Sequence, residues 1–349
     1  MVLSFKSNKD ISLEYRNGHF FSNGEMVGSI PLSSIRQILS HIRLTNRLLR
    51  LEPRLAVALT EKEYVVVFQR KIFLLNILKK CITETYPVRE GFSNPLNICS
   101  MKKYGQSVAY WGDYEINEGK KSINIYKYQV GAPPKACYTF KEGLINHIHQ
   151  IMFDSWRERF IIFTGDFGKK VGIYTADKEF TKVEPLFVGN ENYRACQGIV
   201  TKDGLLWATD AVMKENHLYY LSFSQPDKIQ DLATLNGSVI YGLPINDGLL
   251  FSTTVESYPS NNRGFSKFLD DRIGPGIKSK DVDLMFVSKD LKLQLLHRFK
   301  KDHWPMRLFQ YGQIMFPSFD GGEYFVNEII VNPMAVKKYD GKPFTVKLE

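Results

Sequence analysis

The sequence predicts an all-β fold, a single β-propeller of six blades, and two observations carry this prediction. Short runs rich in Val, Ile, Tyr and Phe, separated by turns, occupy nearly everything after residue 54. Such runs are typical of β-strands. Pairs of these runs also recur at a spacing of about 40 to 50 residues, the period of four-stranded propeller blades.

The middle strands of each predicted blade form a hairpin, and six hairpins follow one another. They comprise residues 64–75, 107–126, 159–174, 204–221, 248–287 and 313–326. Residues 11–30 read as two further strands, and we expect them to complete the last blade and close the ring. The whole chain, residues 1–349, is therefore expected to form one domain.

Two segments depart from this pattern. Residues 1–52 carry the N-terminal strands and a short helical segment, 33–51, in which Ile35, Ile38, Leu39 and Ile42 have helical spacing among four arginines. An amphipathic basic helix can lie on a membrane surface, or this one can pack against the propeller rim. Residues 258–280, rich in Gly, Pro, Ser and Asn, form a loop insertion in the fifth hairpin. A long loop of this kind is often a lid or a binding loop.

Composition narrows the classes of function. The chain has 349 residues, with 44% hydrophobic, 13% aromatic and 24% charged residues, which indicates a folded globular protein. A formal net charge of +9 favours anionic partners. Because the basic residues are scattered and no nucleic-acid-binding motif appears, nucleic acid is an unlikely partner.

Location is inferred from what the sequence lacks. The four cysteines have neither metal-site spacing nor the density of a disulfide scaffold, and they read as reduced thiols. No apolar run approaches the length of a transmembrane helix, and the first ten residues do not resemble a signal peptide. We therefore expect a cytoplasmic protein; its oligomeric state is not specified by the sequence.

In a propeller, the segments between blades and the loops inside the middle hairpins open on one face, so their residues should converge there. His147 and His149 are two residues apart at the start of a strand, and their side chains should point the same way. With Asp166 or Asp210, which follow strands, they could provide acid–base chemistry or hold a divalent metal ion. The alternatives are that the histidines cap backbone groups and that the aspartates form turns.

Three arginines recur just before or within innermost strands, and they are candidates for binding a carboxylate. Alternatively, each forms a surface ion pair. Aromatic and amide side chains nearby could stack on and hydrogen-bond a sugar ring. The candidate substrate-binding residues are Arg54, Arg194, Gln197, Trp304 and Arg307.

Two short motifs carry a resemblance to a known family. Thr175-Ala-Asp177 and Ser288-Lys-Asp290 follow the third strand of a blade, and they resemble the opening of the Asp-box turn in sialidase-like (BNR-repeat) propellers. The chain departs from that pattern after Asp177, where Glu179 and Lys182 replace the usual Gly and Trp.

The resemblance implies a triad of arginines that binds a substrate carboxylate, a Tyr/Glu nucleophilic pair and an Asp acid/base. Arg54, Arg194 and Arg307 match the first role, and Tyr241 with Glu256 is one pairing for the second. We therefore expect a carbohydrate-active enzyme, a glycoside hydrolase or lyase acting on an anionic saccharide by carboxylate and histidine chemistry. The alternative is a non-catalytic propeller that binds a glycan or a protein.

Overall fold

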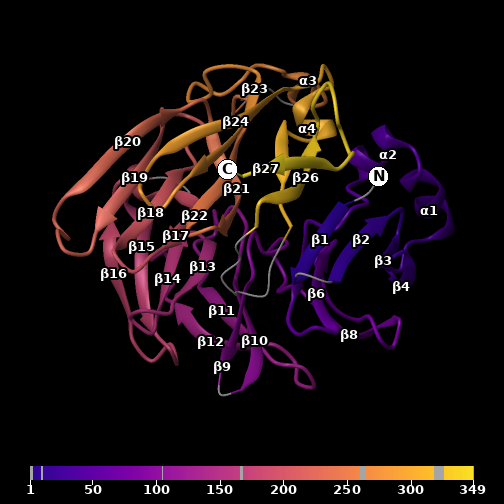
Figure 1. Cartoon of the computed structure of the whole chain (residues 1–349), viewed down its shortest axis with the longest axis horizontal. Helices are drawn as coiled ribbons and strands as arrows, with labels where there is room; N and C mark the ends of the chain where they lie inside the picture. The colour runs from indigo at the N-terminus through magenta and orange to yellow at the C-terminus, as the bar shows by residue number, and fades with distance from the viewer. Residues whose placement is uncertain are drawn as a thin grey trace.

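The fold is an all-β propeller, but it has seven blades instead of the six expected from the sequence. The computed structural model describes residues 3–8, 11–103, 105–165, 168–259, 264–317 and 326–348. Within them lie seven antiparallel sheets, six with four strands and one with three. In Figure 1 the colour runs around the molecule in chain order, so that the first and last blades become neighbours.

Each blade is built from consecutive strands. The first comprises β1 (Leu3–Asn8), β2 (Ile11–Arg16), β3 (His19–Ser22) and β4 (Glu25–Ser29). The second comprises β5 (Leu55–Ala58), β6 (Glu63–Phe68), β7 (Lys71–Asn76) and β8 (Cys81–Pro87). The third comprises β9 (Cys99–Lys103), β10 (Gln106–Gly112), β11 (Ile123–Tyr128) and β12 (Lys135–Phe140). The fourth comprises β13 (Ile148–Asp154), β14 (Arg159–Thr164), β15 (Gly172–Asp177) and β16 (Val183–Val188).

The remaining blades continue the same order. The fifth comprises β17 (Ala195–Val200), β18 (Gly204–Thr209), β19 (Asn216–Ser222) and β20 (Ile229–Leu235). The sixth comprises β21 (Ser238–Ile245), β22 (Gly248–Thr254), β23 (Asp281–Val287) and β24 (Leu293–Lys300). The last comprises β25 (Gln313–Met315), β26 (Glu328–Met334) and β27 (Phe344–Lys347).

Short helices lie in the connections between strands. Between blades lie α1 (Ser34–Ser40), α2 (Arg43–Leu49), α4 (Met306–Phe309) and the 3-10 turn Glu191–Tyr193. Within blades lie α3 (Ser266–Leu269) and the 3-10 turn Gly168–Lys170.

The blade count was wrong at both ends of the chain. Residues 11–30 do not complete the last blade, because β1 to β4 form a sheet of their own. The last predicted hairpin, 313–326, is also wrong: β25 pairs with β26, so Gln313 lies opposite Met334. Residues 318–325 of that hairpin lie outside the described residues. The other five hairpins are confirmed by the pairing of β6 with β7, β10 with β11, β14 with β15, β18 with β19 and β22 with β23.

Tight turns and apolar faces explain why the blades form. Gln69 and Arg70, and likewise Asn246 and Asp247, have positive φ in two-residue loops, the geometry that matches strand twist in a hairpin. The second strands are almost wholly buried, whereas the outer strand β8 alternates between exposed and half-buried residues. The cores accordingly lie between neighbouring sheets, and one apolar cluster joins the first two blades to the last two.

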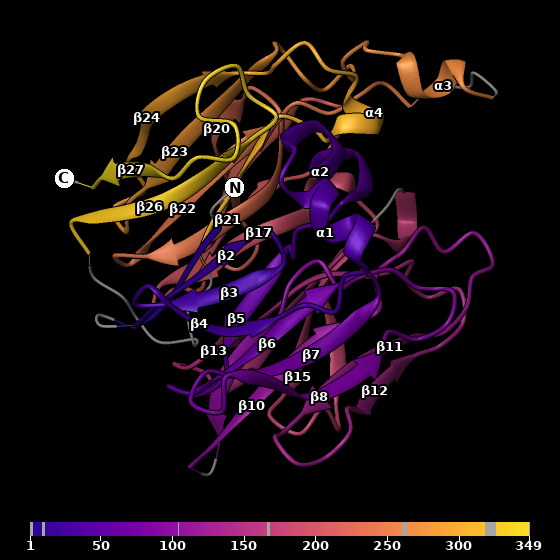
Figure 2. The same cartoon turned by 90° about the vertical axis from the view of Figure 1, so that its right-hand side faces the viewer.

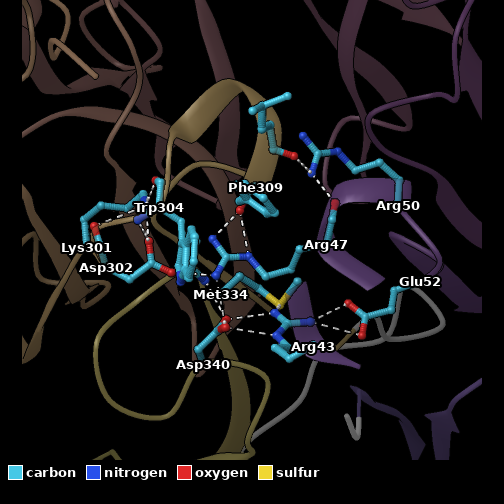
Figure 3. A network of polar contacts seen from close by, with 12 residues as sticks. Arg43, Arg47, Arg50, Glu52, Lys301, Asp302, Trp304, Phe309, Met334 and Asp340 are labelled. Atoms are coloured by element: carbon cyan, nitrogen blue, oxygen red, sulfur yellow. Dashed lines mark hydrogen bonds and ion pairs between the residues drawn. The ribbon is translucent and has the colours of Figure 1, made fainter. Parts of the chain in front are cut away.

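A cluster of arginines closes the ring between the N-terminal segment and the last blade. Arg47, which is 1% exposed, places Nη1 2.5 Å from an Asp302 oxygen and 3.2 Å from an Asp340 oxygen. Arg43 donates to Asp340 at 2.8 Å and to Glu52 at 3.1 Å. Figure 3 shows both guanidinium groups reaching from α2 to Asp340. Since no described strand is shared by the first and last sheets, side chains alone hold this seam.

The helical segment 33–51 is two helices, which break at His41 and Ile42. Arg47 of α2 donates to Phe309 O of α4, and Figure 2 shows α2 beside α4. However, Ile35, Ile38 and Ile42 point outward and are 71%, 67% and 55% exposed. Packing against the rim is therefore confirmed, but through the arginines and not through the isoleucine face. No described helix is long and apolar enough to span a membrane.

The insertion 258–280 lies in the sixth blade between β22 and β23, and part of it is packed tightly. Tyr258 N donates to Arg272 O, and Gly276 N donates to Val212 O. A Cβ atom on Gly276 would lie 1.9 Å from Lys214 O, so only glycine fits this approach. The end of the insertion is therefore fixed to the neighbouring blade, and residues 260–263 lie outside the described residues.

Candidate functional site

A polar cluster lies where the fourth, fifth and sixth blades meet at the centre of one face. We call this the upper face; it carries the segments between blades and the loops between second and third strands. His147 directly precedes β13, His149 and Cys196 lie in the innermost strands β13 and β17, and Asp210 directly follows β18. All four are at least 96% buried. The expected meeting of His147, His149 and Asp210 is therefore found.

The two imidazoles form a chain of contacts that ends on a backbone carbonyl at each side. His147 Nδ1 lies 2.8 Å from Glu115 O, its Nε2 lies 2.8 Å from His149 Nε2, and His149 Nδ1 lies 3.0 Å from Ala195 O. A carbonyl oxygen only accepts, and only one of the two Nε2 atoms can donate to the other. Two neutral arrangements follow. In one, His147 donates to Glu115 O and accepts from His149, so that His149 Nδ1 carries a lone pair. In the other, His149 donates to Ala195 O and accepts from His147.

The space around this pair is closely fitted. A Cβ atom on Gly165 would lie 2.1 Å from the Nε2 atoms of both histidines, so this position must be glycine for the pair to approach. Tyr114 packs edge-on against His147, with ring centroids 4.8 Å apart. These contacts hold the imidazoles in one orientation.

His149 Nδ1 faces Cys196 and Asp210. Cys196 Sγ lies 3.2 Å from His149 Nδ1 and 3.3 Å from Asp210 Oδ2. Arg194 donates to the same Asp210 oxygen at 3.2 Å. His149 Nδ1 also lies 3.0 Å from Ala195 O. The ligand-type atoms of His149, Cys196 and Asp210 lie within 4.8 Å of one another, which is the arrangement that can hold a metal ion.

Burial dominates the electrostatics of this cluster. Burial, with the charges of His147 and Arg194, lowers the pKa of His149 well below its usual value, so the ring is neutral at physiological pH. Burial and the nearby Asp210 carboxylate raise the pKa of the Cys196 thiol well above its usual value. Cys196 is therefore a neutral thiol in the protein alone.

Glu256 lies beside this cluster and lines a second feature of the upper face. Burial and the charge of Asp210 raise the pKa of Glu256 to about 7, against the opposing effects of Ser238 and Arg194. A cavity of about 290 Å³ is lined by Glu256, Arg307 and Tyr311, with Val212, Ser257, Pro259 and Lys267. Glu256 Oε2 and Arg307 Nε are buried without a hydrogen-bond partner among the described residues.

Arg54 stands in the central channel. Its side chain is exposed, yet Tyr241, Tyr114 and Tyr311 lie close enough to raise its pKa against the effect of burial, and Tyr241 contributes most. A side chain that is both accessible and surrounded by protein is one that lines an internal channel. Arg54 has no carboxylate partner among the described residues.

Arg50 adds a second unneutralised charge. It donates to the carbonyl oxygens of Arg47, Leu308 and Arg307, and to no described carboxylate. Burial and the charges of Arg54 and Arg47 lower its pKa to about 10. The channel mouth therefore carries an excess of positive charge.

The other predicted residues are placed differently. Gln197 faces the lower side, where it donates to Ile240 O and lines a separate cavity of about 610 Å³ at the opposite end of the channel. Trp304 packs against Phe309 in the seam, so its ring is not placed to stack on a sugar. Its backbone carbonyl accepts a hydrogen bond from Lys301 Nζ. Asp166 lies outside the described residues. Asp177, which carries the Asp-box resemblance, makes a turn by accepting from the backbone of Glu179 and Lys182.

Sequence reasoning missed Cys196, Tyr114 and Tyr311 as members of the site. Cys196 was read only as a reduced thiol, and all four cysteines are indeed free. The available signal was positional: Cys196 lies at the start of an innermost strand, as His149 does. Tyr114 likewise follows the second strand of the third blade, as Asp210 follows the second strand of the fifth blade.

Comparison with known proteins shows the fold alone. No protein-family model and no curated protein matches the chain, so nothing supports membership of the sialidase-like family. A prolyl endopeptidase structure has a TM-score of 0.54 at 6% identity, over 99% of this chain and 49% of that chain. A chain of the mitotic checkpoint complex gives 0.54 at 8% identity, over 99% and 87%. The AfRom2 CNH domain gives 0.51 at 9% identity, over 100% and 94%.

Proposed function

We propose that the upper mouth of the channel binds a small carboxylate-bearing ligand, such as an acidic sugar. The observation that carries this proposal is Arg54, an accessible guanidinium that lines the channel without a described carboxylate partner. Guanidinium groups bind carboxylates through two parallel hydrogen bonds. A ligand carboxylate would supply the missing counter-charge.

The surrounding charge supports the same ligand class. The positive charge of Arg54 lies close enough to Arg50 to lower the pKa of Arg50, and a bound anion would relieve this repulsion. The net charge of +9 would attract an anion toward the channel from a distance.

The tyrosines favour a sugar over a bare inorganic anion. Tyr241, Tyr114 and Tyr311 surround Arg54 with hydroxyl groups that donate and accept hydrogen bonds. Their rings also offer apolar faces, and such amphipathic side chains suit a ring that carries hydroxyl groups.

A second candidate function is catalysis on that ligand, as a glycoside hydrolase or lyase. One observation favours it: Glu256 is half-buried beside Asp210, has its pKa raised to about 7, and lines the 290 Å³ cavity with a buried oxygen that has no described partner. A carboxyl group with such a pKa can donate a proton near neutral pH. A non-catalytic binding propeller would have the same arginine and tyrosine site without needing Glu256.

Calorimetric titration tests the binding proposal. Glucuronate, galacturonate and N-acetylneuraminate are titrated into the wild type, with glucose as the neutral control. We expect at least one acidic sugar to bind, and Arg54→Ala to weaken binding at least tenfold, about 1.4 kcal/mol. The matched control Arg16→Ala removes an exposed arginine that pairs with Glu14 on β2, and it should bind as the wild type does. Equal affinity of Arg54→Ala and wild type would refute the proposal.

Catalysis is tested separately by incubating the sugar's glycosides or oligomers with wild type and Glu256→Gln. Release of reducing ends indicates a hydrolase, and ultraviolet absorption of an unsaturated product indicates a lyase. Binding without either product would leave the non-catalytic propeller as the function.

A further inference from the structure

We infer that His149, Cys196 and Asp210 form a binding site for a divalent metal ion of the zinc class, with His147 as the residue that orients His149. This assignment is independent of the proposed anion site, because it concerns different side chains and a different ligand. It also differs from the pair of histidine ligands expected from the sequence.

The spacing of the ligand atoms fits a tetrahedral ion. Cys196 Sγ lies 3.2 Å from His149 Nδ1 and 3.3 Å from Asp210 Oδ2. Tetrahedral zinc bonds of about 2.0 to 2.3 Å place neighbouring ligand atoms roughly 3.3 to 3.7 Å apart. The three ligand atoms would therefore need to move apart only slightly to accept the ion.

One of the two hydrogen arrangements of the histidine pair leaves His149 ready to bind a metal. In it, His147 donates its Nδ1 hydrogen to Glu115 O, and its Nε2 accepts the Nε2 hydrogen of His149. The lone pair on His149 Nδ1 then faces Cys196 and Asp210, and a bound ion would favour this arrangement. A metal-binding histidine commonly has its other ring nitrogen held by an outer partner in this way.

A buried acceptor in this cluster lacks a donor when only the protein is considered. Asp210 is 4% exposed, and its Oδ1 has no hydrogen-bond partner among the described residues. Buried polar atoms are rarely left in this state. A cation held by His149, Cys196 and Asp210 would attract this oxygen.

The chemistry of the ligand set selects the metal. A thiolate with an imidazole favours zinc and similar transition-metal ions over magnesium or calcium, which prefer oxygen ligands. Binding replaces the S–H bond of Cys196 with a sulfur–metal bond, and the proton leaves to solvent. The three protein ligands leave a fourth position, as catalytic zinc sites do.

Cobalt substitution tests the site. The protein is treated with a chelator, freed of it, and titrated with Zn(II) or with Co(II) as a spectroscopic probe. We expect one ion per chain and a thiolate-to-cobalt charge-transfer band. The band should be lost in Cys196→Ser and kept in Cys81→Ser, which changes an exposed thiol on the outer strand β8.

The role of His147 has its own readout. His147→Gln should keep the charge-transfer band and weaken metal binding about 10- to 100-fold. Absence of the band from the wild type, or its survival in Cys196→Ser, would overturn the assignment. Should Cys196→Ser fail to fold, mass spectrometry of the wild type decides instead. Under native conditions the zinc-titrated wild type and Cys81→Ser should each retain one zinc ion per chain, and the absence of bound zinc from the wild type would count against the site.

Discussion

Arg43 of α2 and Asp340 of the last blade are 297 residues apart in sequence, yet their Nη2 and Oδ1 atoms lie 2.8 Å apart. This ion pair belongs to the cluster that joins the N-terminal segment to the last blade. It is partly buried, and Arg47 beside it is almost completely buried. The stability of the ring should therefore depend strongly on these two arginines.

Removing Arg47 should destabilise the protein severely. Arg47→Ala leaves Asp302 and Asp340 without a shared buried partner, and breaking a buried pair in this way costs about 3 to 5 kcal/mol. Urea unfolding measures this free energy. The control Arg36→Ala, at an exposed position on α1 whose side chain donates to Gln69, should change it by less than about 0.5 kcal/mol. A loss below 1 kcal/mol for Arg47→Ala would mean that the seam is held by its apolar contacts.

Glu256 should make stability depend on pH. Burial and Asp210 raise its folded-state pKa to about 7, while Arg194 opposes this and Cys196 stays neutral beside it. The folded protein therefore binds more protons than the unfolded chain between the usual carboxyl pKa and about pH 7, and stability falls as pH rises through this range. Glu256→Gln should remove that fall. The measurement compares the free energies of unfolding of chelator-treated wild type and Glu256→Gln from pH 5 to 8. If the two free energies change with pH in the same way, the prediction for Glu256 is wrong.

The end of the insertion, at Gly276, should be rigid and should not act as a hinge. Gly276→Ala would place a Cβ atom 1.9 Å from Lys214 O and 2.3 Å from Ala211 O. Overpacking against backbone atoms costs about 1 to 3 kcal/mol. The control Gly119→Ala meets nothing closer than Lys121 Cγ at 4.0 Å, so its melting temperature should match that of the wild type. A Gly276→Ala protein as stable as wild type would show that this segment can move.

The sequence predicted the propeller because most blades repeat a local pattern. Runs such as Gly204–Thr209 form buried second strands, and their period reveals the repeat without any knowledge of long-range contacts. The predicted number of blades was wrong because the apolar strand pattern is weak in the first and last blades. β25 has only three residues, and β1, with polar residues at four of its six positions, carries little apolar signal.

The candidate site could be predicted only in part, for a related reason. Propeller topology brings the starts of innermost strands together, and this placed His147, His149 and Asp210 correctly near one another. The approach of His149 Nδ1 to Cys196 depends on contacts between two blades, and such contacts have no sequence pattern. The unneutralised state of Arg54 likewise depends on which carboxylates lie near it in space.

The seam between the first and last blades also governs how the ring can be made. Each blade is local in sequence, so during synthesis on the ribosome it can form soon after its own strands emerge. The first blade, however, has one open flank until residues 302 to 340 are made, since Arg47 finds Asp302 and Asp340 only then. An incomplete chain therefore exposes apolar surface at both flanks of the growing arc. Resistance to proteolysis should appear late and abruptly, when the last blade docks onto the first.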